Sequence, residues 1–576
     1  MARTRLFDLL RRSYRLQRSA SRHGEPLCEH LERAREVYLA RRASLLSRRS
    51  VLRASAATGA AFAWSALPGC DAGVTATPVA VVGAGLAGLV CAHRLAQVGV
   101  GVDVFEAWNR TGGRTFTARG MLDGGQICEL GGELIDSDHA VMQGLAMELE
   151  LTLDDLYEPD LLETYFFGGR AVPVSEISAS FAPVAEQIAT QLEATFDVDA
   201  DGEPTSAALA AFMRLDATPL RAWLETPSHG ADATIRALLD VAYTGEYGRE
   251  ADEQSVLNLM YLVDFTSPDP FRIFGDSDER YHVHEGSSAI AEALTERYES
   301  QIQLEHRLVA IREGSGGKLR LVFDRGGSSV EREYEQVLVT VPFSTLRDVE
   351  IDVALSPDKR TLIDELGYGQ NAKLMMQTRT RPWRSAMASG AGFADNGAQS
   401  FWDSSRGQDG EQGILTHFAG GDGGVSLGDG SADSQAERVA SLIDDALPGF
   451  SAARNDRVVR MHWPSQPNFR GSYACYLPGQ WSIGGAEGTV EAEGRLYFAG
   501  EHTSLDYQGF MEGAAESGQR AADDILRARG LDGRAEMLVS AGLVSADIVF
   551  GGASRSRDSA RRHLLGLARA ARRVRA

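Results

Sequence analysis

Three glycines have the type and spacing of a phosphate-binding turn. Gly83, Gly85 and Gly88 follow a short apolar, β-branched run at 79–82 and lead into residues 86–97, which have the character of a helix. The first glycine permits a tight turn, the second lets the backbone approach a pyrophosphate, and the third lets the helix pack closely on the strand. The helix N-terminus then offers free N–H groups and a positive dipole to the phosphates. The residues expected to line this turn are Gly83, Gly85, Leu86, Ala87 and Gly88.

A second predicted strand supplies the partner that such a turn needs. Residues 102–105 read Val-Asp-Val-Phe and end at Glu106, about twenty residues after the turn. A carboxylate at this distance would bind the ribose hydroxyls of an adenosine. The strand, helix and second strand together predict a Rossmann-like unit that binds a dinucleotide.

Two further segments resemble the flavin amine oxidase superfamily, which includes monoamine, polyamine and L-amino acid oxidases. Residues 110–114 read Arg-Thr-Gly-Gly-Arg, an extension that a simple NAD-binding unit does not need. Residues 497–504 and 508–514 resemble the second FAD segment of that family. The resemblance implies that Arg114 contacts the cofactor and that Glu501 holds its ribityl chain.

The resemblance therefore implies an α/β, two-domain flavin amine oxidase fold. A Rossmann-like FAD-binding domain would be joined to a substrate domain with a mixed β-sheet and helices. In the family, the helix at 512–528 directs its N-terminus at the flavin ring. The implied FAD-binding residues beyond the first turn are Glu106, Ala107, Gly113, Arg114, Gly131, Gly132, Val309, Gly500, Glu501, Gly509, Phe510, Met511 and Ala514.

The same resemblance implies catalytic residues. Lys373 lies in an apolar segment and matches the family's flavin-facing lysine, which holds a water against flavin N5. Tyr473 and Phe510 match the two walls of an aromatic cage that holds the amine. Monoamine oxidases attach the flavin through a cysteine just before this tyrosine, and here that position is Ser472. We therefore expect non-covalent FAD.

Residues 129–136 bear on the substrate. L-amino acid oxidases place a carboxylate-binding arginine here, and the matching residue is Leu134. Polyamine oxidases carry an acid at the position of Asp136, which could hold a distal ammonium group. Asp136 could equally cap the helix that follows. The stretch favours a cationic amine and leaves both roles of Asp136 open.

Charge is distributed unevenly along the chain. The net charge is -22, with an excess of nine positive charges in residues 1–53 and of seven in residues 555–576, so the body is strongly acidic. An acidic body argues against nucleic acid and would attract cationic small molecules. We expect no metal site, because the five cysteines are few and scattered and because His282 and His284 read as structural residues of a strand.

The N-terminal region resembles an export signal. Arg48 and Arg49 precede a moderately apolar segment at 54–67, as in twin-arginine signals, and this segment is short for a transmembrane helix. Residues 67–70 resemble a lipoprotein processing site, with lipidation at Cys70 or simple cleavage as the alternatives. Partners would be the twin-arginine machinery and a possible lipid anchor. The expected location is periplasmic or extracellular, with membrane anchoring possible through Cys70.

Two domains and two extensions are predicted. The FAD-binding domain would comprise residues 78–136, 286–345 and 491–530, and the substrate domain residues 137–285 and 346–490. Residues 1–77 form the leader, and residues 531–576 form an extension whose basic tail reads as solvated and disordered. The stretch 140–280 shows no chemical motif and is expected to serve core packing.

These features predict an FAD-dependent amine oxidase. Hydride would pass from the α-carbon of a primary or secondary amine to flavin N5. Water would hydrolyse the imine to an aldehyde. Oxygen, or another acceptor such as a cytochrome or quinone, would reoxidise the flavin. The alternatives are an L-amino acid oxidase and, from another class, a protein that binds FAD without turnover.

Overall fold

A computed structural model describes residues 77–199, 204–484 and 488–531, together with Leu564, Leu567, Ala568 and Ala570–Arg572. All of them belong to one compact unit that begins at Val74. The arginine pair at Arg48 and Arg49, the apolar segment after it and Cys70 lie outside the described residues. Within the described part of the chain, no helix is both long enough and apolar enough to span a membrane.

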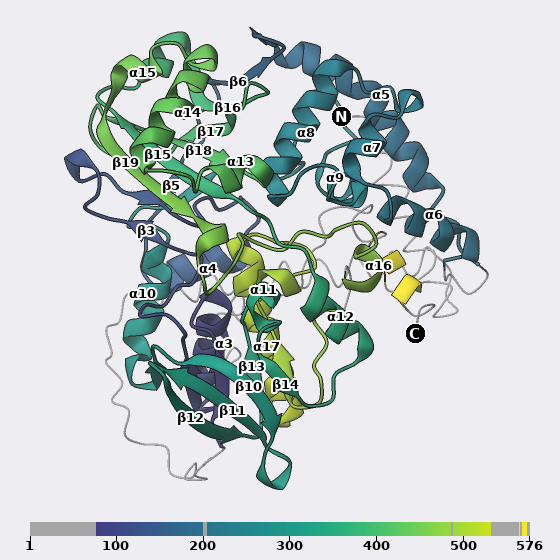
Figure 1. Cartoon of the computed structure of the whole chain (residues 1–576), viewed down its shortest axis with the longest axis vertical. Helices are drawn as coiled ribbons and strands as arrows, with labels where there is room; N and C mark the ends of the chain where they lie inside the picture. The colour runs from purple at the N-terminus through teal and green to yellow at the C-terminus, as the bar shows by residue number, and fades with distance from the viewer. Residues whose placement is uncertain are drawn as a thin grey trace, which may run out of the picture. The chain divides into compact units, whose positions relative to one another are not determined.

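A five-stranded parallel sheet forms the centre of the predicted cofactor domain (Figure 1). Its strands are paired in the order β20-β13-β1-β2-β9, and their residues are mostly buried, as expected for a parallel sheet covered on both faces. The strands are β1 (Val79–Val82), β2 (Val102–Phe105), β9 (Ile302–Gln303), β13 (Val337–Val339) and β20 (Leu496–Phe498).

Three helices accompany this sheet: α3 (Leu86–Gln97), α10 (Ser288–Arg297) and α17 (Met511–Ala528). Helices α3 and α17 pack closely because Gly518 of α17 has no side chain, and a Cβ there would overlap the carbonyl oxygen of Ala87. The helix predicted at residues 86–97 is confirmed with the same bounds. The turn and the second cofactor segment therefore lie side by side although about 430 residues separate them.

A four-stranded sheet packs beside the parallel sheet, with the order β12-β11-β10-β14. Phe105 of β2 stacks on Phe323 of β11 at 4.3 Å between ring centres, which joins the two sheets through one core. A β-bulge interrupts the pairing of β10 between Leu308 and Ala310. The strands are β10 (Arg307–Glu313), β11 (Leu319–Arg325), β12 (Ser328–Tyr334) and β14 (Glu350–Asp352).

A seven-stranded mixed sheet forms the second half of the unit, in the order β19-β15-β18-β17-β16-β6-β7. Leu374 and Met376 of β15 pack against α14 (Ala432–Ala446), so the alternation of a strand turns Lys373 to the opposite face. The strands are β6 (Leu162–Phe167), β7 (Arg170–Ala171), β15 (Ala372–Thr378), β16 (Ala388–Ala394), β17 (Gln399–Asp403), β18 (Gly413–Ala419) and β19 (Arg454–His462).

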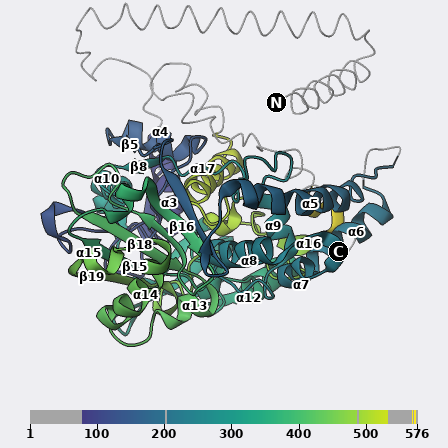
Figure 2. The same ribbon diagram turned by 90° about the horizontal axis from the view of Figure 1, so that it is seen from above.

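A group of helices lies beside this sheet, and Figures 1 and 2 show it on the side away from β19. Side chains of Thr205, Asp232 and Ser255 cap α6, α8 and α9, which fixes where these helices begin. The helices are α5 (Val174–Glu193), α6 (Ser206–Asp216), α7 (Leu220–Leu224), α8 (Ala233–Tyr247) and α9 (Val256–Leu262).

Short elements complete the described chain. They are β3 (Thr117–Ala118), β4 (Cys128–Glu129), α4 (Ala140–Glu148), β5 (Leu153–Asp155), β8 (Tyr281–Val283), α11 (Phe343–Leu346), α12 (Pro357–Glu365), α13 (Gly421–Ser426), α15 (Phe450–Ala453) and α16 (Trp481–Gly484). The two-domain α/β fold with a mixed second sheet is confirmed, whereas the exact domain boundaries stay a prediction.

The C-terminal tail differs from the expectation of a solvated, disordered segment. Its described residues are helical, and Leu564, Leu567, Ala568 and Ala571 are buried in the largest hydrophobic core. Arg572 forms ion pairs of 2.7 Å with Asp358 and Glu491. The apolar spacing at 564, 567, 568 and 571 is that of one helix face, which explains why the basic composition does not keep the tail in solvent.

Candidate active site

One cavity of about 370 Å³ lies between the parallel sheet and the mixed sheet. It is lined by both cofactor segments predicted from the sequence and by residues of the mixed sheet and the helix group. Every predicted site residue except Gly88 lines it: Gly83, Gly85, Leu86, Ala87, Glu106, Ala107, Gly113, Arg114, Gly131, Gly132, Asp136, Val309, Lys373, Tyr473, Gly500, Glu501, Gly509, Phe510, Met511 and Ala514.

Glycine occurs at each of the three positions of the first turn for a different structural reason. Gly83 adopts φ +108°, a conformation that favours glycine. A Cβ on Gly88 would overlap the carbonyl oxygen of Gly83, so this glycine permits the contact between helix and strand and does not line the cavity. A Cβ on Gly85 would meet no protein atom closer than the Cα of Gly113 at 3.9 Å. Protein packing does not require glycine at 85, but a ligand close to the backbone would.

Two helix N-termini open into the cavity without a capping side chain. Helix α3 begins after Gly85 and helix α17 after Phe510, and neither of these residues caps its helix. The first N–H groups of a helix have no partner inside the helix and attract anions or polarised oxygens. The cavity therefore offers one cluster of N–H donors for a pyrophosphate and a second one for an electron-rich ring system.

Glu106 sits where a ribose-binding carboxylate is expected. Its Oε2 accepts from the backbone N–H of Ala84 at 2.7 Å and its Oε1 from that of Trp108 at 2.7 Å. Burial raises the pKa of Glu106, and the backbone donors oppose that shift. These bonds fix the carboxylate at the end of β2, directly beside the glycine turn.

The β-bulge in β10 brings backbone to the other end of the cavity. The register shifts between Leu308 and Ala310, so Val309 is the bulged residue. A bulged residue is left out of the ladder, and its peptide groups can meet a ligand. Val309 lines the cavity, as the resemblance implies for the residue near the adenine.

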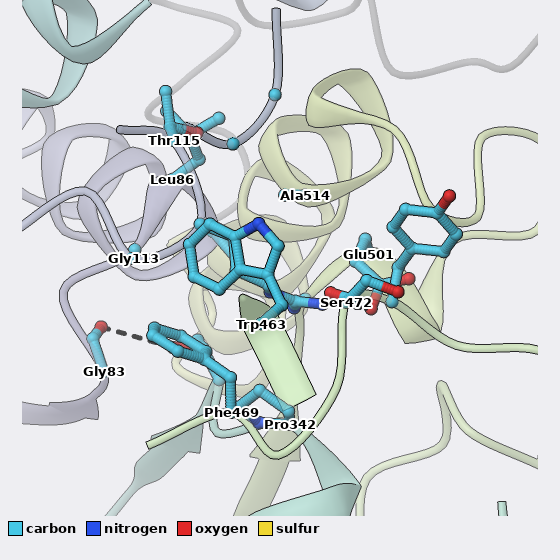
Figure 3. Close-up of a pocket in the computed structure, with 18 of the residues that line it drawn as sticks. Gly83, Leu86, Gly113, Thr115, Pro342, Trp463, Phe469, Ser472, Glu501 and Ala514 are labelled. Carbon is cyan, nitrogen blue, oxygen red and sulfur yellow. Dashed lines mark hydrogen bonds and ion pairs between the residues drawn. The ribbon is translucent and has the colours of Figure 1, made fainter. Parts of the chain in front are cut away.

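Glu501 joins the two cofactor segments. Its carboxylate pairs with Arg114 at 2.9 Å and accepts from the backbone N–H groups of Ala474 and Gly509. Arg114 also donates to the carbonyl oxygen of Ser472. Figure 3 shows Trp463 and Phe469 side by side, with Gly83 and Gly113 to one side and Ser472 and Glu501 to the other.

Gly131 and Gly132 let three chain segments meet. A Cβ on Gly131 would overlap the carbonyl oxygen of Arg114, and a Cβ on Gly132 would meet Met511 at 2.6 Å. The Nζ of Lys373 reaches the same place and donates to the carbonyl oxygen of Gly131 at 2.8 Å. The lysine is 5% exposed, and that exposed part faces the cavity.

Aromatic side chains gather at the end of the cavity beyond Lys373. Phe418 and Trp402 share the face of the mixed sheet that carries Lys373, by the register of β15, β18 and β17, and their rings lie 5.6 Å apart. Tyr473 donates to the carbonyl oxygen of Gly245 at 3.3 Å, and Phe510 lines the same cavity. Rings of this kind bind apolar groups and attract cations.

Two glutamates from the stretch 140–280, which the sequence assigned to core packing, line this end of the cavity. Glu246 lies in the last turn of α8, and Glu279 precedes β8. Burial and the charge of Asp136 raise the pKa of Glu246 to about 7. Burial and the charges of Asp136 and Glu246 raise the pKa of Glu279 to about 8. More than a third of Glu279 is exposed and the residue lines the cavity, so water in the cavity reduces the shift that burial causes.

Asp136 lines the cavity, but protein groups surround its carboxylate. Oδ1 accepts from the backbone N–H of Glu279 at 2.9 Å, and Oδ2 lies 3.2 Å from Nε2 of His139. Burial would raise the pKa of Asp136, and the bonds from His139 and Glu279 outweigh it and lower the pKa. Asp136 does not cap α4, because Glu512 accepts from the first N–H groups of that helix.

Several lining residues were not predicted. The carboxyl ends of parallel strands meet at one sheet edge, so residues 340–342 after β13 could have been identified from the apolar run Val-Leu-Val-Thr-Val-Pro at 337–342. Glu246, Glu279 and Trp402 carry no local signal, because only the tertiary fold brings them to the cavity. The other unpredicted lining residues include Glu133, Tyr247, Phe418, Trp463 and Phe469.

These features define an oxidoreductase that combines a dinucleotide-binding turn with a second cofactor segment. Residues 86–526 match the model of the family described as flavin containing amine oxidoreductase, and the chain belongs to this family. It is therefore a flavin-dependent enzyme that acts on amines, and its cofactor is FAD. The glycine cradle and the two uncapped helix N-termini fit that cofactor.

Three similar proteins illustrate the range of the family. Amine oxidase [flavin-containing] A of Equus caballus is 25% identical over 471 residues, which cover 78% of this chain and 85% of that protein. An L-amino acid dehydrogenase of Synechocystis sp. is 24% identical over 465 residues, covering 77% and 94%. A putrescine oxidase structure, wild type bound to putrescine, shares the fold with a TM-score of 0.66 at 22% identity, covering 78% and 99%.

Proposed function

We propose that the enzyme oxidises a cationic amine with a second positive charge, such as a diamine or polyamine. The observation that supports this substrate is the combination of aromatic rings and two glutamates, Glu246 and Glu279, at the end of the cofactor cavity. The rings suit the reacting amine, and the carboxylates suit an ammonium group farther along the substrate. Asp136, which the sequence suggested for that task, acts indirectly. It accepts from the backbone N–H of Glu279, and its charge raises the pKa of both glutamates.

FAD, when bound, would supply the two-electron redox chemistry, and water would hydrolyse the resulting imine to an aldehyde and an amine or ammonia. The protein binds and orients the amine. Tyr473 and Phe510 hold the reacting end, where a neutral amine is needed for hydride loss. Glu246 and Glu279, once ionised, hold the distal ammonium through charge-assisted hydrogen bonds. The substrate would then be neutral at its reacting nitrogen and positively charged at its distal nitrogen.

We propose that FAD is bound without a covalent link. The hydroxyl of Ser472 is hydrogen-bonded to Oδ1 of Asn371, and serine at this position offers no thiol for attachment. Cys475 is buried, contacts Asn258 and Tyr476, and does not line the cavity. The cofactor would be held by non-covalent contacts alone, from the glycine turn, Glu106, Arg114, Glu501 and the two helix N-termini.

The second candidate substrate is an L-amino acid, because relatives of that activity are similar to this chain. Such a substrate needs a cation for its carboxylate. The arginines that line the cavity are Arg114, Arg307 and Arg470, all on the cofactor side. Arg272 pairs with Asp264 and Asp276, and Arg280 pairs with Asp155, all outside the cavity lining. The absence of an arginine among the lining residues near Leu134 favours the cationic amine.

A substrate panel tests the proposal. Purified, FAD-loaded enzyme is mixed with a diamine, the monoamine of equal length and a set of L-amino acids, and turnover is followed both by peroxide release and by dye reduction. We expect the diamine to have the highest kcat/KM. Faster turnover of L-amino acids would overturn the substrate assignment. Dye reduction without peroxide would keep the substrate and replace oxygen by another acceptor.

We also propose export by the twin-arginine route. The proposal rests on the sequence of residues 47–70 alone. Replacing Arg48 and Arg49 by lysine should retain the protein in the cytoplasm, and continued export would refute the signal. Cys70→Ala should release the mature protein from the membrane if Cys70 is lipidated, and should change nothing if the leader is simply cleaved.

A further inference from the structure

The ammonium group of Lys373 has a protein acceptor for each of its three protons. Nζ lies 2.9 Å from Oε2 of Glu133, 2.8 Å from the carbonyl oxygen of Gly131 and 3.3 Å from that of Glu129. It also lies 5.1 Å from the ring centre of Trp402, within cation–π range. A lysine ammonium has three donors. The three acceptors hold the ammonium group at one place beside the cavity.

Glu133 is held as firmly as the lysine it contacts. Its Oε1 accepts from the indole N–H of Trp402 at 3.0 Å and from the hydroxyl of Ser404 at 2.7 Å. Burial would raise the pKa of Glu133, and the charge of Lys373 together with the Ser404 hydroxyl outweighs it and lowers the pKa. Glu133 is 8% exposed, so an ionised carboxylate is fixed beside the ammonium and largely out of water.

Other titratable groups face the pair from β4 and β8. The carboxylate of Glu129 accepts from Thr117 and from the backbone N–H of Ser287, and it lies 3.1 Å from Nε2 of His282. Burial would lower the pKa of His282, and Glu129 and Glu133 outweigh it and raise the pKa. Burial raises the pKa of the Cys128 thiol to about 12, so that group is neutral.

We infer that Lys373 acts as a fixed positive charge at the cofactor cavity and that Glu133 is the positioning residue that holds it there. The inference rests on the proposed function, since it concerns the same bound FAD. A permanent cation beside the flavin would stabilise its reduced, more negative form.

Removing the counter-charge should make the lysine titratable. In Glu133→Gln the buried ammonium loses its ion pair and gives up its proton more readily as the pH rises. The measurement is the reduction potential of the bound flavin from pH 6 to pH 9, compared with wild type and with the double variant Glu133→Gln/Lys373→Met. The double variant is the matched control, because any titration of His282 persists in it whereas that of Lys373 does not.

At pH 6 the potential of Glu133→Gln should be at or above that of wild type. By pH 9 it should fall to that of the double variant, and its kcat/KM should drop by about tenfold over the same range while wild type lacks this drop. Curves that run parallel to wild type at every pH would overturn the role of Glu133. Ser404→Ala keeps both charges and should titrate like wild type.

A second pair of variants tests the lysine itself if Glu133→Gln does not fold. Lys373→Arg keeps a charge that does not titrate, and Lys373→Met removes it. We expect the arginine variant to keep the flavin potential near that of wild type and the methionine variant to lower it. An equal drop of the flavin potential in both variants would overturn the role of Lys373 as a fixed positive charge. The potential is measured without substrate, so a wrong choice of amine would leave this result intact.

Discussion

The backbone of Glu279 adopts φ +44°, a left-handed conformation that residues other than glycine rarely adopt. It directs a carboxylate into a cavity that already holds Glu246 and Asp136. Strained backbone and clustered like charges both cost stability, and both are characteristic of functional sites. A distal cation would offset the repulsion among these acids, which is the physical reason to assign the ammonium-binding role to this end.

Neutralising the glutamates should separate two substrate types. Glu246→Gln and Glu279→Gln each remove a charge that the proposed function assigns to the distal ammonium group alone. A charged hydrogen bond contributes about 1–3 kcal/mol, so kcat/KM for a diamine should fall by about tenfold to a hundredfold. The monoamine of equal length should change little. The exposed Glu285→Gln, outside the cavity, is the matched control, and an equal loss for both amines would contradict the assignment.

Asp136→Asn should behave differently from the two glutamate variants. Its carboxylate holds His139 and the backbone of Glu279, so the substitution should lower the Tm and weaken diamine and monoamine turnover together. Thermal unfolding and steady-state rates for both amines check this. A selective loss of diamine turnover with an unchanged Tm would restore Asp136 as the ammonium ligand.

The raised pKa values of the two glutamates predict a pH dependence. Glu246, with a pKa of about 7, and Glu279, with a pKa of about 8, are largely protonated below those values and become charged above them. The diamine-to-monoamine ratio of kcat/KM should therefore rise between pH 6 and pH 9. The ratio should be flat in the double variant Glu246→Gln/Glu279→Gln. A ratio that falls as the pH rises in wild type would contradict the model.

At the scale of elements, the glycine turn offers a matched pair of substitutions. Gly85→Ala places a methyl group in open space toward the cofactor, whereas Gly88→Ala forces one against the Gly83 carbonyl oxygen. The first should weaken FAD binding and leave the Tm of the apoprotein near that of wild type. The second should lower the Tm of the apoprotein. FAD titration and thermal unfolding check both, and wild-type FAD affinity in Gly85→Ala would show that the ligand does not pass there.

Elements with a strong local pattern could be predicted from sequence. The run at 79–82, the glycine turn and the helix at 86–97 are consecutive in the chain, so local sequence alone is enough to predict their conformations. The residues of β15 around Lys373 were recognised because their segment resembles the family. Glu246 and Glu279 could not be predicted, since their role depends on the fold of the helix group against the mixed sheet. The sequence predicted a solvated, disordered tail because its high arginine content was given more weight than the helical spacing of its apolar residues, which are buried in the core.

At the scale of the whole molecule, the body of the chain and the end of the cavity that holds the glutamates both carry an excess of acidic residues. A net charge of -22 raises the local concentration of cations and should speed their association. The kcat/KM for a diamine should therefore fall with added salt more steeply than that for a neutral amine analogue. Equal salt dependence for the two would show that the body charge serves solubility alone.

The non-covalent cofactor gives another whole-molecule prediction. Acid precipitation of the purified enzyme should release all of the yellow flavin into the supernatant, because Ser472 cannot form a thioether. Ser472→Cys is the informative comparison, since it restores the residue type found in covalent relatives. Flavin that stays with the wild-type pellet would contradict the alignment around Tyr473.

The central claim is that this cavity binds FAD and that a cationic amine reduces it. The most direct measurement is anaerobic mixing of the FAD-loaded enzyme with a diamine while the flavin absorbance is recorded, which depends on no electron acceptor. The absorbance should bleach rapidly with the diamine, more slowly with the monoamine and least with L-amino acids, and Glu246→Gln/Glu279→Gln should lose the advantage of the diamine. A flavin that stays oxidised with every amine would contradict the account.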